Sequence, residues 1–310
     1  MTATYNTSIS IEAILYMAET YQVHATVMHE LLPLSINLES EEITATDTLK
    51  TLTTYFYKFI NGLCKIIEFA INKIKALFKI FSARAKDVQM GNADFIAKYG
   101  PRLERISYAK VNYEGFNMGT EITSMGNEIG LISGANYSDL KMIILDNRKV
   151  FNSPDDIDEF VSKNRFAILS SNQYITNTKY LSDEAFKNEL YYKYYGRKGH
   201  YTCDVHSALD VIKGFRIQYE NAKRINDLAI INGNNDIKEI EKLKSIFKSR
   251  TISGRLGIAK DDLVEQLVML SKYRTQTLND SINAFGVILK YIDDANLQAK
   301  SICIKALQEN

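Results

Sequence analysis

The sequence predicts a mainly α-helical protein with long amphipathic helices, a C-terminal helical bundle and a small α+β module in the middle. Three observations predict this class. Only three prolines interrupt the 310 residues. Apolar residues recur at helical spacing over long stretches. Short apolar runs among glycines occur between about residues 104 and 180.

The N-terminal helical region is expected to cover residues 1–103. Residues 9–32 carry apolar side chains at helical spacing, and Pro33 ends that helix. A second helix is predicted over residues 48–86, with Asp47 or Thr48 as its cap and a wide apolar face.

The small α+β module is expected to cover residues 104–181. Alternating or continuous apolar runs predict short strands there, and glycines between them predict turns. The predicted strands are residues 106–116, 140–145 and 165–169. The sequence NSPDDIDEFVSK predicts a helix start, with Ser153 as cap, Pro154 in the first turn and acids that suit the helix dipole.

The C-terminal helical bundle is expected to cover residues 182–310. Ser182 caps its first helix, Gly196 ends it, and the sequence NGNN at 232–235 is expected to end the second. The predicted helices are residues 182–196, 204–231, 236–250 and 260–307. Helices of this length with short links pack as an antiparallel bundle or as an elongated rod.

The net charge of +1 hides two segments of opposite charge. Residues 1–47 contain seven acidic residues and no lysine or arginine, whereas residues 48–86 contain eight basic residues and one acid, Glu68. The two segments could neutralise each other within the fold, or be separated by processing and meet different partners. We favour neutralisation within the fold, because charge runs usually mark solvated or paired faces.

The basic stretch 48–86 allows three uses. Lysines interrupt every apolar window long enough to span a bilayer, so a membrane-spanning segment is not expected. A helix packed in a bundle is favoured, while an interfacial helix on anionic lipid and a nucleic-acid contact remain open. The side chains expected to form this assembly or surface-contact helix are Lys58, Lys65, Lys73, Lys75, Lys79, Phe59 and Phe78.

One group of residues has metal-ligand character. His200, Cys203 and His206 recur at steps of three, which makes zinc conceivable. Structural zinc requires four ligands, however, and no second Cys/His pair lies nearby. We therefore favour a polar helix start capped by Asp204, and we expect no metal.

No catalytic signature stands out, so no enzymatic activity, cofactor or small-molecule substrate is expected. The glycines of residues 115–134 lack the Gly-Lys-Ser/Thr of a phosphate-binding loop. The tyrosines of YYKYYGRKGHY could stack on single-stranded nucleic acid, but a core or interface position is favoured. The three distant cysteines are typical of reduced thiols.

The stretch LTTYFYKFINGLCKIIEFAINKIKALFKIF, followed shortly by DFIAKYGPRL, resembles a pattern in virion structural proteins of large tailed bacteriophages. The resemblance covers residues 48–105. The second element is carried by Asp94, Phe95, Ile96, Lys98, Tyr99 and Leu103.

The resemblance implies a non-enzymatic virion component, made in the host cytoplasm and built into the particle, with the interior of the head as one location. Its partners would be itself, other virion proteins or packaged DNA, and a membrane surface is a less favoured partner. The alternative is a membrane-active or host-directed phage protein that uses the helix 48–86.

A processing site is the last prediction that the resemblance implies. Some large phages trim head proteins after a small residue, any residue and glutamate, and Ser40-Glu41-Glu42 fits this rule between the acidic and the basic segment. The same rule also fits sequences ending at Glu121 and Glu128. Cleavage after Glu42 would remove an acidic segment and leave a basic helix for DNA.

Overall fold

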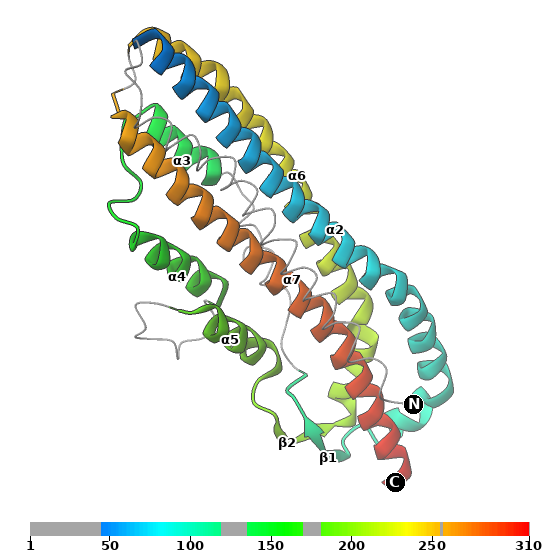
Figure 1. Ribbon diagram of the computed structural model, residues 1–310. Coiled ribbons are helices and arrows are strands. Elements are labelled where there is room, and N and C mark those ends of the chain that lie inside the picture. Colours follow the sequence, from blue (N-terminus) through cyan, green and yellow to red (C-terminus); the bar gives the residue numbers. More distant parts are fainter. Residues whose placement is uncertain (1–44, 119–134, 170–180, 255–256, 310) are drawn as a thin grey trace. The chain divides into compact units, whose positions relative to one another are not determined.

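The computed structural model describes residues 45–118, 135–169, 181–254 and 257–309. These residues form six helices and one two-stranded sheet, which confirms the mainly α class (Figure 1). The elements are α2 (Ala45–Arg105), β1 (Lys110–Gly115), α3 (Ala135–Ile144), α4 (Asp156–Leu169), α5 (Asp183–Tyr195), β2 (Gly199–Asp204), α6 (Val205–Ile252) and α7 (Lys260–Glu309).

The three longest helices contribute to two compact units. Each unit combines one part of α2, one part of α6 and one part of α7 with shorter elements. The described residues of unit 1 lie within 45–70, 135–161 and 232–279, and those of unit 2 lie within 71–118, 162–231 and 280–309. The three consecutive regions expected from the sequence stay a prediction.

Aromatic stacking and hydrogen bonds join α2 to α6 in unit 1. The rings of Phe56 and Phe247 stack with their centroids 4.0 Å apart. Tyr57 donates its hydroxyl proton to the Lys244 carbonyl at 3.2 Å. Cys64 of α2 is also buried. The apolar residues predicted for the helix 48–86 thus form part of a packed interior.

One buried glutamine on α7 fixes the segment that precedes α4. The Gln266 side-chain oxygen accepts from the backbone N–H groups of Val150 at 2.7 Å and Phe151 at 3.0 Å. Its amide nitrogen donates to the Phe151 carbonyl at 2.6 Å. Three backbone groups outside regular secondary structure are thereby satisfied, which a buried segment requires.

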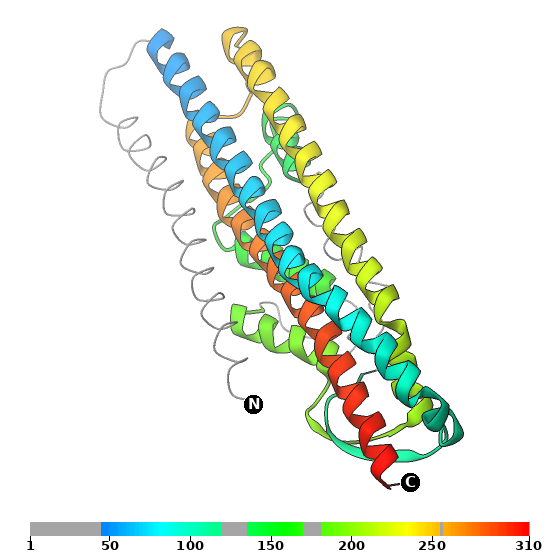
Figure 2. The same cartoon turned by 90° about the vertical axis from the view of Figure 1, so that its right-hand side faces the viewer.

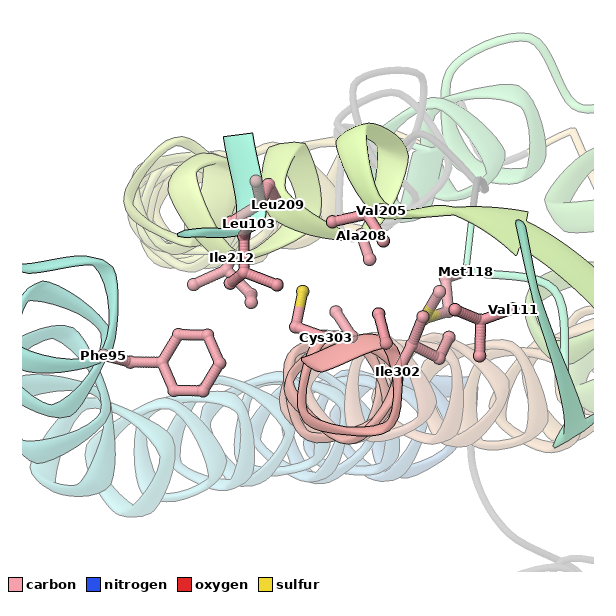
Figure 3. Close-up of a cluster of buried hydrophobic side chains, with 12 residues drawn as sticks. Phe95, Leu103, Val111, Met118, Val205, Ala208, Leu209, Ile212, Ile302 and Cys303 are labelled. Atoms are coloured by element: carbon pink, nitrogen blue, oxygen red, sulfur yellow. The ribbon is translucent and has the colours of Figure 1, made fainter. Parts of the chain in front are cut away.

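A cluster of buried side chains forms the core of unit 2 (Figure 3). Side chains of α2, α6, α7 and β1 point toward one another there, with Cys303 and Ile302 of α7 between the others. The labelled members are Phe95, Leu103, Val111, Met118, Val205, Ala208, Leu209, Ile212, Ile302 and Cys303. The antiparallel pair β1–β2 covers this core, with Lys110 opposite Asp204 and Gly115 opposite Gly199.

Polar contacts in unit 2 show how α2 and α6 run. Ser82 Oγ lies 2.9 Å from Tyr219 OH, and Asn92 donates to the Ile212 carbonyl at 3.2 Å. The residue number on α6 falls as that on α2 rises, so the two helices are antiparallel (Figure 2). Asn92 also donates to Asn296 of α7 at 2.8 Å, which joins all three helices.

Two of the predicted strands are wrong. Residues 140–145 fall mostly in α3, and residues 165–169 are the last turn and a half of α4. Leu140, Ile143 and Ile144 are fully buried, at the spacing of one helix face. Short apolar runs do not distinguish a buried strand from a buried helix, and here the helix forms.

The third predicted strand is confirmed in part, because residues 110–115 form β1. Its partner β2 covers Gly199–Asp204, a strand that the sequence did not predict. Asp204 does cap the helix that follows, since its carboxylate accepts from the Ser207 N–H at 2.7 Å.

The predicted end of a helix at NGNN is wrong, because α6 continues through 232–235 to Ile252. Ala229, Asp236 and Ile240 are buried on one face on both sides of that sequence. Tertiary packing of this face outweighs the weak helix propensity of glycine and asparagine.

Other helix boundaries agree more closely with the sequence. Ser182 caps α5 by accepting from the Ala185 N–H, and Gly196 ends the helix with a positive φ, as expected. The long C-terminal helix is confirmed as α7. Helix α4 begins at Asp156, two residues after Pro154, and the Asp156 carboxylate accepts from the Asn152 and Ser153 N–H groups, as in a capping box with Ser153 as the cap. The predicted helix 9–32 lies outside the described residues.

Candidate functional site on helix α2

Helix α2 separates its apolar and basic side chains onto opposite faces. Lys58, Lys65, Lys75 and Lys79 are exposed, whereas Phe59 is buried and Phe78 is half-buried. Lys73 is half-buried and has a contact of its own. The helix extends to Arg105, well past residue 86, because Phe95 and Leu103 continue its buried face. Both elements of the phage resemblance therefore lie on one helix.

In unit 1, α2 carries few exposed lysines near α6. Lys58 and Lys65 point into solvent, and the neighbouring Asn61 accepts from Lys244 of α6 at 2.7 Å. Lys244 also lies 3.6 Å from Glu241 on its own helix. The basic charge of α6 facing this part of α2 is thus partly neutralised.

The part of α2 in unit 2 borders an open hollow of about 370 Å³. Helix α2 supplies most of the lining and α6 supplies one buried asparagine. The lining residues are Lys75, Phe78, Lys79, Ser82, Ala83 and Asn226. Two of the predicted lysines and the predicted Phe78 therefore meet at one hollow, with both ammonium groups free to contact an anion.

An aromatic cluster and one hydrogen bond form the floor beside this hollow. The Tyr219 ring lies 5.8 Å from the Phe78 ring and 5.9 Å from the Phe81 ring. The Ser82–Tyr219 hydrogen bond ties the two helices at this point. The walls of the hollow are thereby fixed by packing, as a preorganised contact surface requires.

Asn226 carries an unsatisfied polar atom at the hollow. The residue is only 6% exposed, and its amide nitrogen donates to Asp227 at 3.0 Å. Its side-chain oxygen has no hydrogen-bond partner among the described residues. A buried acceptor in this state is expected to bind a water molecule or a donor group of a ligand.

Arg216 and Lys223 on α6 were missed by the sequence reasoning. Both are exposed and lie three and four positions from Tyr219, which places them on the face of α6 that meets Ser82 of α2. The available signal was their spacing of seven residues, but only the structure shows that this face adjoins the lysines of α2.

The structure does not bring the metal candidates together. His200 is exposed on β2, Cys203 is half-buried and directed at the Asp204 carbonyl, and His206 of α6 lies 3.4 Å from Asp210. Within the described ranges, no group of three His, Cys, Asp or Glu side chains has the arrangement of a metal site. Neighbouring β-strand residues point to opposite faces, which separates donors that a helix would align.

Most tyrosines of the aromatic and basic segment have structural roles. Tyr194 is fully buried, and Tyr195 donates to Asp294 of α7 at 2.9 Å. Burial and the adjacent Asp294 carboxylate raise the pKa of Tyr195. Tyr201 stacks on Tyr113 of the paired strand, with centroids 5.8 Å apart. A core position is confirmed for Tyr194, whereas Tyr195 and Tyr201 are half-buried.

Two further predictions concern the processing site at Glu42 and membrane-spanning helices. Glu42, the predicted processing site, lies outside the described residues. In the part of the chain that the structure describes, no helix combines the length and the apolar character needed to cross a bilayer.

The fold and the hollow define a class: a mainly helical protein with a basic, preorganised surface between two helices. Comparison of the chain with protein-family models, with curated proteins and with solved structures gave no match. The resemblance to virion proteins therefore stays a prediction.

Proposed function

We propose that the protein is a non-enzymatic virion structural or internal head protein of a tailed bacteriophage. It acts by assembling with itself or with other virion proteins. It is made in the host cytoplasm and becomes part of the particle.

The division of α2 into a buried apolar face and an exposed lysine face carries this proposal. Ile60, Ile67 and Ile74 are each buried below 1% exposure, so the apolar face belongs to the protein's own core. Four lysines opposite this face are exposed and can contact another molecule: Lys58, Lys65, Lys75 and Lys79. A rigid helix with an exposed charged face suits assembly, because it binds without paying the entropy of ordering.

Buried polar residues support a structural role as well. Arg165 of α4 is bonded to Asp280 of α7 at 2.7 Å, and Gln266 holds the segment before α4. Arg274 of α7 is paired with Asp139 of α3. These groups are engaged in joining helices to one another.

The alternative of a membrane-active protein requires more rearrangement. An interfacial helix places its apolar face in lipid. That face of α2 includes Phe56 and Phe59, which are buried in the folded chain, so it would have to leave the core. The fold therefore supports assembly better than lipid insertion.

Quantitative mass spectrometry of purified particles from the virus that encodes the chain tests the proposal. The experiment records the copy number per particle and the first residue present. We expect many copies per particle. A lysate protein of similar abundance that is not part of the particle serves as the control for carry-over.

Absence from washed particles would overturn the proposal. Co-sedimentation of the protein with anionic vesicles would then become the next measurement. A first residue near position 43 would support processing after Glu42, whereas peptides from the acidic segment at full abundance would exclude it.

A further inference from the structure

Five exposed cations lie on the faces of α2 and α6 beside the hollow in unit 2, and we call the surface between them the groove. They are placed by the Ser82–Tyr219 hydrogen bond, which fixes the two helices at the middle of the groove. Residues three, four or seven positions away share a helix face. On the faces of Ser82 and Tyr219 these positions are Lys75, Lys79 and Lys86 of α2 and Arg216 and Lys223 of α6.

The five cations form two groups along the groove. Because the helices are antiparallel, Lys79 and Lys223 lie toward one end of the Ser82–Tyr219 contact, while Lys86 and Arg216 lie toward the other. The row on α2 extends about 16 Å, at a rise of about 1.5 Å per residue. The groove therefore presents positive charge on both walls.

Other basic residues of the same helices are neutralised. Arg84 lies 3.5 Å from Asp293, and Lys213 lies 3.6 Å from Glu104. In contrast, no carboxylate of the described residues lies within 4.0 Å of the five groove cations. Glu220 and Asp227 of α6 are exposed acids beside Arg216 and Lys223, and Asp227 accepts from Asn226. Because neither acid forms an ion pair with the five cations, the groove keeps a net positive charge.

We propose that this groove binds the sugar–phosphate backbone of a nucleic-acid duplex, independently of its sequence. The inference deepens the proposed function and rests on it, because it names a partner for the same surface of α2. A duplex carries one negative charge per about 1.7 Å of axis, so a groove of this length meets enough phosphates for all five cations.

The shape of the surface favours nucleic acid over a membrane. A lipid-binding helix needs apolar side chains between its cations to enter the bilayer. In the groove the side chains between the cations are Phe78 and Tyr219, and both are engaged with each other in the aromatic cluster. Two walls of cations suit a rounded phosphate backbone, which phosphate-contacting lysines and arginines bind without reading bases.

The test measures binding of the full chain to a fluorescently labelled duplex of mixed sequence, by anisotropy, between 50 and 200 mM salt. Two double variants each remove one charge from α2 and one charge from α6. The first is Lys79→Gln with Lys223→Gln, and the second is Lys86→Gln with Arg216→Gln. The matched control is Lys238→Gln with Lys248→Gln, which removes two exposed charges from α6 in unit 1.

Counterion release sets the expected values. Five phosphate contacts give a slope of log affinity against log salt of about −4.5, so affinity falls about 500-fold across this range. Each groove variant should reduce the slope by about 2, so that the fall becomes about 40-fold. The control should keep the slope of the unmodified chain, and a second duplex sequence should bind equally well.

Several outcomes would overturn the inference. One is no binding at 50 mM salt, and another is an equal effect of the control and the groove variants. A third is binding to phosphatidylglycerol vesicles that the groove variants abolish while duplex binding persists, which would assign the groove to lipid. All variants must keep the helical circular dichroism of the unmodified chain, as expected for exposed positions.

The two proposals fail in different ways. A protein present in particles that does not bind the duplex would keep the structural function and reject the groove. A protein that binds the duplex through the groove but is absent from particles would reject the virion function.

Discussion

Arg165 in unit 2 and Arg274 in unit 1 are both buried arginines paired with aspartates, yet their surroundings differ. Arg165 donates to Asp280 at 2.7 and 3.2 Å, to the Leu181 carbonyl at 2.7 Å and to Asp183. Its guanidinium also lies over the Phe186 ring. Every nitrogen of this side chain has a partner.

Arg274 has fewer partners. It donates to Asp139 and lies 4.5 Å from the ring centroid of the adjacent Tyr273. Its Nε has no hydrogen-bond partner among the described residues. An unsatisfied buried donor costs stability, so the same pairing contributes less here.

The difference concerns how many elements each arginine joins. Arg165 connects α4 with α7 and with the start of α5, whereas Arg274 connects α7 with α3. A buried charge that joins three elements depends on all of them, so its removal should loosen a larger part of the protein.

The largest effect is expected from Arg165→Met. The change leaves the Asp280 carboxyl buried without its cation, which typically costs about 3–5 kcal/mol. Urea unfolding followed by circular dichroism measures the loss. Hydrogen exchange should accelerate in α4 and α5.

The control for this prediction is Arg224→Met, at an exposed arginine of α6 in the same unit. Its effect should stay within about 0.5 kcal/mol. Equal stability of Arg165→Met and the unmodified chain would show that the buried pair is not a net contributor.

A smaller effect is expected from Arg274→Met, about 2 kcal/mol, because one donor of this arginine is already unsatisfied. Hydrogen exchange should accelerate in α3 and stay unchanged in α5. Adding Asp139→Leu should restore part of the stability, since it removes the unpaired carboxylate. A loss as large as that of Arg165→Met would remove the contrast between the two arginines.

The smallest effect concerns pH and Asp293 of unit 2. Burial raises the pKa of the Asp293 carboxyl to about 6, the charge of Arg84 opposes this, and Asp294 adds to it. Burial likewise raises the pKa of Asp280 to about 6, against the hydrogen bond and the charge of Arg165. The folded chain therefore binds protons that the unfolded chain, with an aspartate pKa near 3.8, releases.

The free energy of unfolding should therefore be higher at pH 5 than at pH 7. Most of the change should occur near pH 6, where the two carboxyl groups of the folded chain lose their protons. Asp293→Asn should stabilise the protein by about 1 kcal/mol at pH 7 and flatten this dependence. Unfolding by urea at pH 5 and pH 7 measures both effects. A variant with the same pH dependence as the unmodified chain would contradict the prediction.

Long-range periodicity made the main helices predictable. Apolar spacing predicted α2 and α7, and the residues at its ends, Ser182 and Gly196, predicted α5. The failures occurred where a short segment carried the signal. Residues 140–145 and 165–169 are apolar runs of five or six, too short for their period to separate helix from strand.

The strand β2 and the groove could not be predicted, for a different reason. Gly199–Asp204 forms a strand because β1 lies beside it, and no local pattern names that partner. Arg216 and Lys223 were likewise unremarkable on their own helix. They form a surface with the lysines of α2 only because Ser82 and Tyr219 bring the two helices together.

The buried cysteines give each unit a chemical reporter of its own opening. Cys64 lies in unit 1 and Cys303 in the core of unit 2, and burial raises their pKa to about 11 and about 12. Thiol reagents attack the thiolate, so neither side chain should react until its own unit opens. Labelling rates resolved by cysteine would therefore show whether the two units open together or one at a time, without any introduced probe.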